Sequence, residues 1–265
     1  MKLNLFIKLS IAFLLLQSCN DKIPKESKKA KEENKTVSSI DTTKTKKEVK
    51  WDVLSITRID STEFLEAKRK AHFENKTYKV IRDFITAKKM LKGIVSFGDY
   101  ENSEWIENDT GESVIEITPR NGKKVIKAEP ETYFVAYYPE LDILLCEGGH
   151  TIDVSYNLLT GETTEDTGNP EFIVPSSDGT LRLNGHYDGQ ECYTTFIQQK
   201  EGGHFKKIIK LSEIFNSRMG EFSLCTIGDS FWKNNTTLYL EETDNYQGRT
   251  QISYYYSIKL MTNPD

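Results

Sequence analysis

The fold of this chain is restricted most strongly by a series of short β-type segments that begins at Gly93. The segments are rich in branched and aromatic residues and are separated by Gly, Asn, Asp or Pro, as is typical of strands joined by turns. Consecutive strands with such short connections pair antiparallel, because a parallel pair needs a crossover of about a dozen residues. We therefore predict a mainly β fold, built as an antiparallel meander. The predicted strands are residues 93–97, 113–118, 123–127, 133–138, 143–146, 151–156, 172–174, 181–183, 192–198, 205–211, 224–227, 237–241 and 252–260.

Local signals add a hairpin and one or two helices near the start of this region. Asn121-Gly122 is a dipeptide that favours a type I′ hairpin turn. Asp60 and Glu63 have the spacing of a capping pair at the start of a helix. Residues 78–91 favour a helix as well, although their β-branched content leaves a strand open. The helix predicted after Asp60 contains Phe64, Ala67, Lys68 and Ala71 at helical spacing.

The later strands group into three blocks of similar length, residues 131–165, 172–211 and 222–260. Each block holds three or four predicted strands, and a four-stranded blade of a common β-propeller occupies about 40–45 residues. The spacing therefore predicts that each block forms one small antiparallel sheet.

Two turn sequences in these blocks resemble those of β-propeller blades. Pro170-Glu171-Phe172, followed by the Pro-Ser-Ser-Asp-Gly of residues 175–179, resembles the strand, turn and strand that open many blades. Leu159-Thr160-Gly161-Glu162 resembles the Thr-Gly-Glu turn that links outer strands. The resemblance implies small or incomplete β-propeller-like sheets, with residues 93–128 as a fourth block. A plain curved antiparallel sheet is the competing interpretation.

The N-terminal segment ends in Leu16-Gln17-Ser18-Cys19, after an apolar stretch with Lys2 and Lys8 near it. This arrangement resembles a bacterial lipoprotein signal. The resemblance implies cleavage before Cys19, diacylglycerol on its sulfur, and a further acyl chain such as palmitate on its amine. A membrane-spanning helix needs about 20 apolar residues, and Lys8 interrupts this one. An ordinary secretory signal remains the alternative.

A lysine-rich stretch follows the cysteine and has almost no apolar residues. Such a composition cannot bury enough surface to offset its ordering entropy, so we expect a disordered tether with a span of roughly 30 Å. The predicted organisation is a signal peptide over residues 1–18 and the lipidated cysteine and linker over 19–50. An α+β entry region over 51–130 and an antiparallel β region over 131–265 then form one folding unit.

Charge separates the predicted domain from its tether. Residues 51–265 carry 23 basic and 34 acidic side chains, a net charge of −11. Nucleic acid is therefore excluded as a predicted partner, because its binding depends on Lys and Arg that neutralise phosphates. The predicted partners are a membrane, reached through the lipid anchor, and a protein or glycan.

Three cysteines remain if Cys19 carries lipid. They are Cys146, Cys192 and Cys225, so at most one disulfide can form among them. Among the possible pairs, Cys192 with Cys225 is the one most compatible with a disulfide, and the ordinary interpretation is that all three are buried thiols that pack as small hydrophobic residues. The chain contains no Cys-x-x-Cys motif, so neither a zinc ribbon nor a thioredoxin-like centre is predicted.

Three histidines, His150, His186 and His204, each follow a glycine. If they converge in space, they form a divalent-metal site together with Glu147, Asp188 or Glu191. The ordinary interpretation is that they end turns and donate hydrogen bonds to backbone carbonyls. We predict no metal and no cofactor.

The densest polar stretch is residues 184–192, a loop between two predicted strands. Loops on a rigid sheet are common positions for binding groups. Phe231-Trp232 and Trp105 are candidates for an aromatic face beside it. The candidate binding residues are His150, His186, Tyr187, Asp188, Glu191 and His204.

Common catalytic motifs are absent: the sequence has no Gly-x-Ser-x-Gly, no His-Glu-x-x-His, no phosphate-binding loop and no dinucleotide-binding glycine pattern. The sequence therefore predicts a lipid-anchored protein of the cell envelope, on the periplasmic face or the cell surface, whose β domain binds a protein or glycan without catalysis. One alternative is an envelope hydrolase, with or without a metal. The other is an acidic protein of the inhibitor or immunity type.

Overall fold

The computed structural model describes residues 50–71, 77–98, 111–189, 192–220, 224–244 and 252–263, apart from the side chains of His150 and Asp244. The chain divides into two compact units, Met1–Lys46 and Lys47–Asp265, and every described residue belongs to the second. The predicted signal and Cys19, most of the tether, Trp105 and Glu191 lie outside the described residues. None of the described helices has the length and apolar character needed to cross a membrane.

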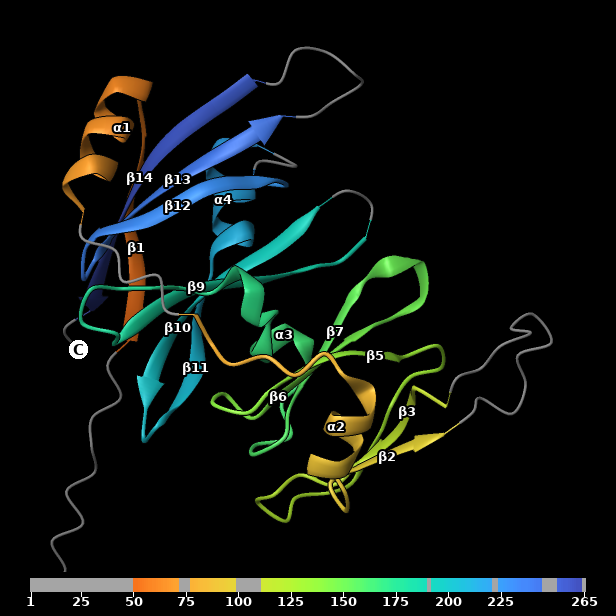
Figure 1. The fold of residues 1–265 in the computed structure, drawn as a ribbon. Helices are drawn as coiled ribbons and strands as arrows, with labels where there is room; N and C mark the ends of the chain where they lie inside the picture. The colour runs from red at the N-terminus through yellow and green to blue at the C-terminus, as the bar shows by residue number, and fades with distance from the viewer. Residues whose placement is uncertain are drawn as a thin grey trace, which may run out of the picture. The chain divides into compact units, whose positions relative to one another are not determined.

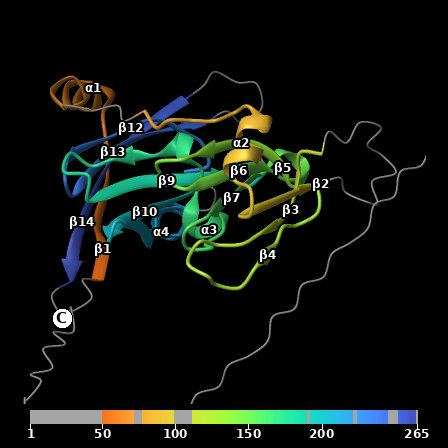
Figure 2. The ribbon, with the colours of Figure 1, turned by 60° about the horizontal axis from the view of Figure 1, so that its bottom comes forward.

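The described residues form three antiparallel sheets (Figures 1 and 2). The mainly β antiparallel fold is therefore confirmed. Sheet A contains, in spatial order, β1 (Lys50–Ile59), β14 (Ile252–Asn263), β13 (Thr237–Asp244) and β12 (Ile227–Asn234). Sheet B contains β2 (Val95–Gly98), β3 (Ser113–Ile117), β5 (Tyr133–Tyr138), β6 (Ile143–Glu147) and β7 (Asp153–Asn157), with β4 (Ile126–Lys127) beside β3. Sheet C contains β11 (His204–Lys210), β10 (Tyr193–Glu201), β9 (Leu181–Tyr187) and β8 (Val174–Pro175).

Each of the three predicted blocks supplies the strands of a different sheet. Residues 93–128 do not form a fourth block, because β2, β3 and β4 join β5 to β7 in sheet B. Sheet A gains β1, a strand that the sequence did not predict, at its edge beside β14. Among the described strands no sheet closes into a barrel. The resemblance to propeller blades thus reaches no further than three successive antiparallel sheets.

Helix α1 (Ser61–Lys70) begins where the capping pair predicted it. The Asp60 side chain accepts a hydrogen bond of 2.8 Å from the backbone N–H of Glu63. Phe64 is buried beneath the helix and contacts the rings of Phe231 and Tyr239 on the outer face of sheet A.

The helix predicted over residues 78–91 is shorter than expected. Helix α2 is Phe84–Met90, capped by Asp83, and the residues before it are extended. The reason is an open edge on β5, because β3 pairs with β5 only at Ser113 and Tyr133. Ile81 pairs with Tyr137 at the part of this edge that β3 leaves free.

Two helices were not predicted, α3 (Thr164–Thr167) and α4 (Leu211–Met219). Leu211, which was expected to end a strand, starts α4 instead. Leu211 and Phe215 are spaced by one helical turn, and both are buried in the core between sheets A and C. Two single 3₁₀ turns, η1 (Gly149–Thr151) and η2 (Pro170–Phe172), complete the fold.

Several local predictions were wrong in detail. The strand expected over residues 172–174 is replaced by η2 and by β8, which starts at Val174, and the one expected over 123–127 is reduced to β4. Asn121-Gly122 does not form a type I′ turn, because only Gly122 has a positive φ and its N–H donates to the carbonyl of Pro119. The strand expected over residues 224–227 is instead β12, which starts at Ile227 and includes Phe231 and Trp232.

Sheets A and C face one another across one apolar core. Their edges also approach: β1 lies near β11, and β12 lies near β8. The two sheets therefore meet along two seams, and α4 packs into the core between them. The buried core side chains include Val53, Leu183, Ile197, Phe215, Leu240 and Ile258.

Candidate functional site

A cleft of about 270 Å³ opens in the seam where β12 of sheet A meets β8 and β9 of sheet C. Ile227, Gly228 and Ser230 of β12 line one wall. Phe172 and Val174 line the opposite wall, so two strand edges and a 3₁₀ turn enclose the space.

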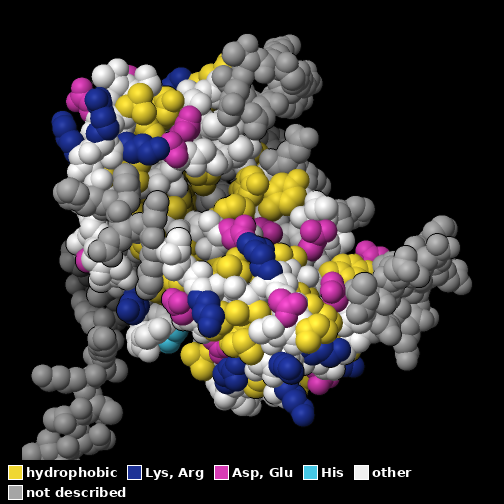
Figure 3. Space-filling model, viewed as in Figure 1, with side chains coloured by type: hydrophobic (Ala, Val, Ile, Leu, Met, Phe, Trp, Pro, Cys, Tyr) yellow, Lys and Arg dark blue, Asp and Glu magenta, His cyan; other side chains and the backbone are white. Residues whose placement is uncertain are grey.

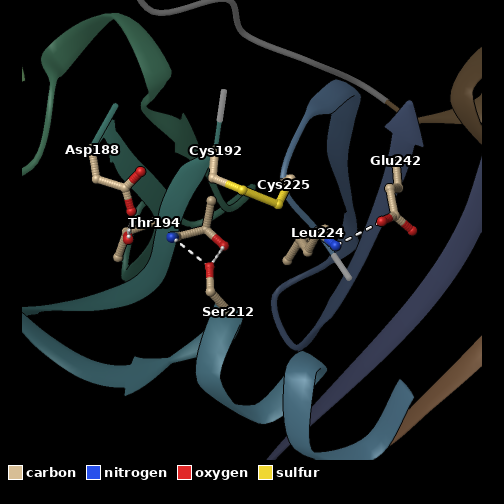
Figure 4. The surroundings of a disulfide bond; sticks show 8 residues. Asp188, Cys192, Thr194, Ser212, Leu224, Cys225 and Glu242 are labelled. Atoms are coloured by element: carbon tan, nitrogen blue, oxygen red, sulfur yellow. Dashed lines mark hydrogen bonds between the residues drawn. A yellow bond between two sulfur atoms is a disulfide. The ribbon is translucent and has the colours of Figure 1, made fainter. Parts of the chain in front are cut away.

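The seam is closed by a hydrogen bond on one side of this opening and by a disulfide on the other. The indole Nε1 of Trp232 donates to the carbonyl of Val174 at 2.9 Å. Cys192 and Cys225 form a disulfide, the pairing favoured from the sequence, and Figure 4 shows the bond between the start of β10 and the segment that leads into β12. The residues that follow these cysteines, Tyr193 and Thr226, both line the cleft. The disulfide therefore fixes two parts of its wall.

The floor of the cleft is the inner face of sheet C. Gly185 is required there, because a Cβ at this position would lie 2.6 Å from the carbonyl oxygen of Thr194. Thr195, the partner of Gly185 on β10, also lines the floor. Its N–H donates at 2.7 Å to the hydroxyl of Ser212, at the start of α4 (Figure 4). This bond holds the floor against the first turn of the helix.

Aromatic rings form one side of the site. The rings of Phe172 and Tyr193 meet edge to face, with 5.1 Å between their centroids. The ring of Tyr187, one of the predicted binding residues, packs against the ring of Tyr193, with 5.2 Å between their centroids. Burial, reinforced by the carboxylate of Asp153 and by Tyr187, raises the pKa of Tyr193 above its usual 10.0. The phenol therefore stays neutral at physiological pH and can donate a hydrogen bond.

Glu171 is the one carboxylate among the described residues that line the cleft. Its Oε1 accepts a hydrogen bond of 3.1 Å from the hydroxyl of Tyr138 and a charged one from Arg82. Its other oxygen, Oε2, accepts no hydrogen bond from the described residues. The carboxylate is thus held in place with one oxygen available to a ligand.

The predicted site residues His186 and Asp188 lie beside the cleft and do not line it. His186 is buried, and its Nε2 lies 3.6 Å from Oε1 of Glu165. Burial lowers the pKa of His186 below 6.5, and the nearby carboxylates of Glu165, Asp188 and Asp153 oppose this only in part. Asp188 accepts a hydrogen bond of 2.8 Å from the hydroxyl of Thr194 (Figure 4).

The histidines do not form one group. His186 lies opposite Thr194 of β10, whereas His204 lies opposite Glu201. Thr194 and Glu201 are seven residues apart on one strand, so His186 and His204 are separated by roughly 23 Å at about 3.3 Å per residue. The side chain of His150 and all of Glu191 lie outside the described residues. Among the residues that the structure does describe, no three His, Cys, Asp or Glu side chains gather as metal ligands would.

The sequence-based reasoning missed most of the cleft. Phe172, Val174 and the lining residues of β12 carry no motif, and Pro170-Glu171-Phe172 was interpreted as the first strand of a blade, whereas it forms the 3₁₀ turn η2. The favoured disulfide was the available signal, because Tyr193 and Thr226 follow its two cysteines.

The described surface gives no charge-based site on the face seen in Figure 3. Basic and acidic side chains are interspersed there over α1 and α2, without a large area of one sign.

Comparison with known proteins gives no assignment: no family model, curated protein or solved structure matches this chain.

Proposed function

We propose that this chain is a lipid-anchored protein of the cell envelope whose β domain binds a protein or glycan partner in the cleft between β12 and β8–β9, without catalysis. The observation that carries the proposal is the cleft itself. It combines an aromatic pair, Phe172 and Tyr193, with hydroxyl groups and one held carboxylate. Binding sites commonly join an apolar lining to a few placed polar groups in this way.

The groups that line the cleft favour binding over hydrolysis. A glycoside hydrolase uses two carboxylates that flank the bond to be cleaved, whereas the part of the lining that the structure describes contains one, Glu171. Glu171 is also engaged by Arg82 and Tyr138. The arrangement can therefore orient a ligand through charge and hydrogen bonds.

The anchor is the second part of the proposal and rests on Leu16-Gln17-Ser18-Cys19. Cells grown with an alkyne-bearing palmitate should incorporate the label into the wild-type chain. The Cys19→Ser variant should not be labelled. Equal labelling of both chains would remove the lipid anchor from the proposal.

The cleft is tested with the full chain in detergent micelles, screened against arrays of envelope glycans and short peptides. Each ligand is then tested on two variants at one position. Ser230 lies two residues before Trp232 on the same strand, so both side chains point toward sheet C. Ser230→Phe should fill the cleft and abolish binding, whereas Ser230→Ala, which removes one hydroxyl and adds no bulk, should weaken binding much less. Undiminished binding by a folded Ser230→Phe variant would contradict the proposal.

A further inference from the structure

The exposed edge of β12 offers backbone hydrogen bonds to the cleft. Among the described strands, β12 pairs only with β13. The N–H of Thr243 donates to the carbonyl of Thr226, so the backbone of Thr226 faces β13. Backbone groups alternate in direction along an antiparallel pair. The N–H and C=O of Ile227 therefore point away from β13, toward the cleft that Ile227 lines.

The same alternation applies further along the strand. On β13 the backbone groups of Thr243 face β12, and the direction reverses at each residue along the strand. Three residues earlier, the backbone groups of Leu240 therefore face β14. Its partner on β12 is Ser230, whose backbone groups therefore also point outward. Ile227 and Ser230 thus present two sets of donors and acceptors, with a register shift between them.

The cleft behind this edge has room for one bulky group. Its volume of about 270 Å³ is below the roughly 300–1,000 Å³ typical of pockets that enclose a whole drug-sized ligand. Phe172, Val174 and Leu183 give it an apolar lining. An aromatic or large aliphatic side chain fits this space and chemistry.

Charge also points to one class of partner. Glu171 is the carboxylate in the described lining, and its Oε2 oxygen accepts no hydrogen bond from the described residues. Residues 51–265 carry a net charge of −11. A ligand with a basic group next to its apolar group complements both features.

We infer that the cleft binds an extended, basic peptide segment that adds as a strand to the edge of β12 and inserts one bulky apolar side chain toward Phe172 and Leu183. The backbone of the segment pairs with Ile227 and Ser230, and a Lys or Arg side chain lies beside Glu171. Strand addition of this kind obtains affinity from backbone bonds and specificity from pockets for alternate side chains. The inference rests on the proposed function and names its partner as peptide.

The test uses fluorescent pentapeptides of the form Lys-Xaa-Phe-Xaa-Lys with the full chain in detergent micelles, measured by anisotropy. In the tightest binder, each backbone nitrogen is methylated in turn. Methylation of alternate nitrogens should weaken binding about tenfold for each hydrogen bond lost, and the intervening positions should change little. An equal effect at every position would overturn strand addition.

Variants separate this inference from the proposed function. Peptide binding should be lost in Ser230→Phe, and Glu171→Gln should reduce the preference for Lys over an uncharged residue in the peptide. If no peptide binds while a glycan binds and Ser230→Phe abolishes that binding, the inference fails and the proposed function stands. If neither class of ligand binds, both fail.

Discussion

The disulfide between Cys192 and Cys225 should be a main source of stability for the domain. The two cysteines are 33 residues apart in sequence. In the chain-entropy model, closing a loop of that length removes enough freedom from the unfolded chain to stabilise the fold by about 3.7 kcal/mol. For a domain of 150–250 residues each kcal/mol shifts Tm by about 2–4 °C. The double variant Cys192→Ala/Cys225→Ala should therefore melt about 7–15 °C below the wild type.

Differential scanning calorimetry with and without a thiol reductant supplies the control. Reductant should lower the Tm of the wild type toward that of the double variant and leave the double variant unchanged. The third cysteine should not interfere, because burial raises the pKa of the Cys146 thiol and keeps it unreactive. A double variant that melts at the wild-type temperature would refute the reasoning.

Three further substitutions test the fold. Phe64→Ala should destabilise the domain by about 3–5 kcal/mol in urea unfolding, because Phe64 is 1% exposed between α1 and sheet A; a loss below about 1 kcal/mol would contradict that packing. Asp60→Ala should cost about 1 kcal/mol through loss of the helix cap and Asp60→Asn much less, and equal losses would remove the cap as the cause. Burial lowers the pKa of His186 below 6.5, so the unfolded chain binds the proton first and stability falls as pH drops through that region. His186→Gln should make the free energy of unfolding less dependent on pH between 7 and 5. An unchanged slope would mean that another titratable group causes the dependence.

The strands were predictable because each one carries its own local signal. Branched and aromatic runs bounded by turn residues located most of the strands, and Asp60 with Glu63 located the start of α1. The strand β1 gave no comparable signal. It is stabilised by pairing with β14, which is about 200 residues away in sequence, and local propensity does not report such a contact.

The same distinction explains the errors. Residues 78–83 have apolar spacing that favours a helix, but the open edge of β5 provides a partner for Ile81. Leu211 was predicted to end a strand, and Phe215 was left outside the predicted elements. Neither residue signals a helix locally, because the core that buries them is assembled from two sheets that are distant in sequence. The cleft was missed for this reason too, since its walls come from β12 and from residues before β9, and only the disulfide joins them in the sequence.

The most direct test of the binding site is amide hydrogen exchange, measured on the full chain with and without the best ligand from the screen. The account predicts that slowed exchange concentrates at residues 226–230, in one wall of the cleft, and at residues 183–185, in its floor. Residues 57–59 and 257–259, on the two strands of sheet A farthest from β12, should exchange at the same rate in both states. Protection of those two strands, with no change at the cleft, would contradict the account.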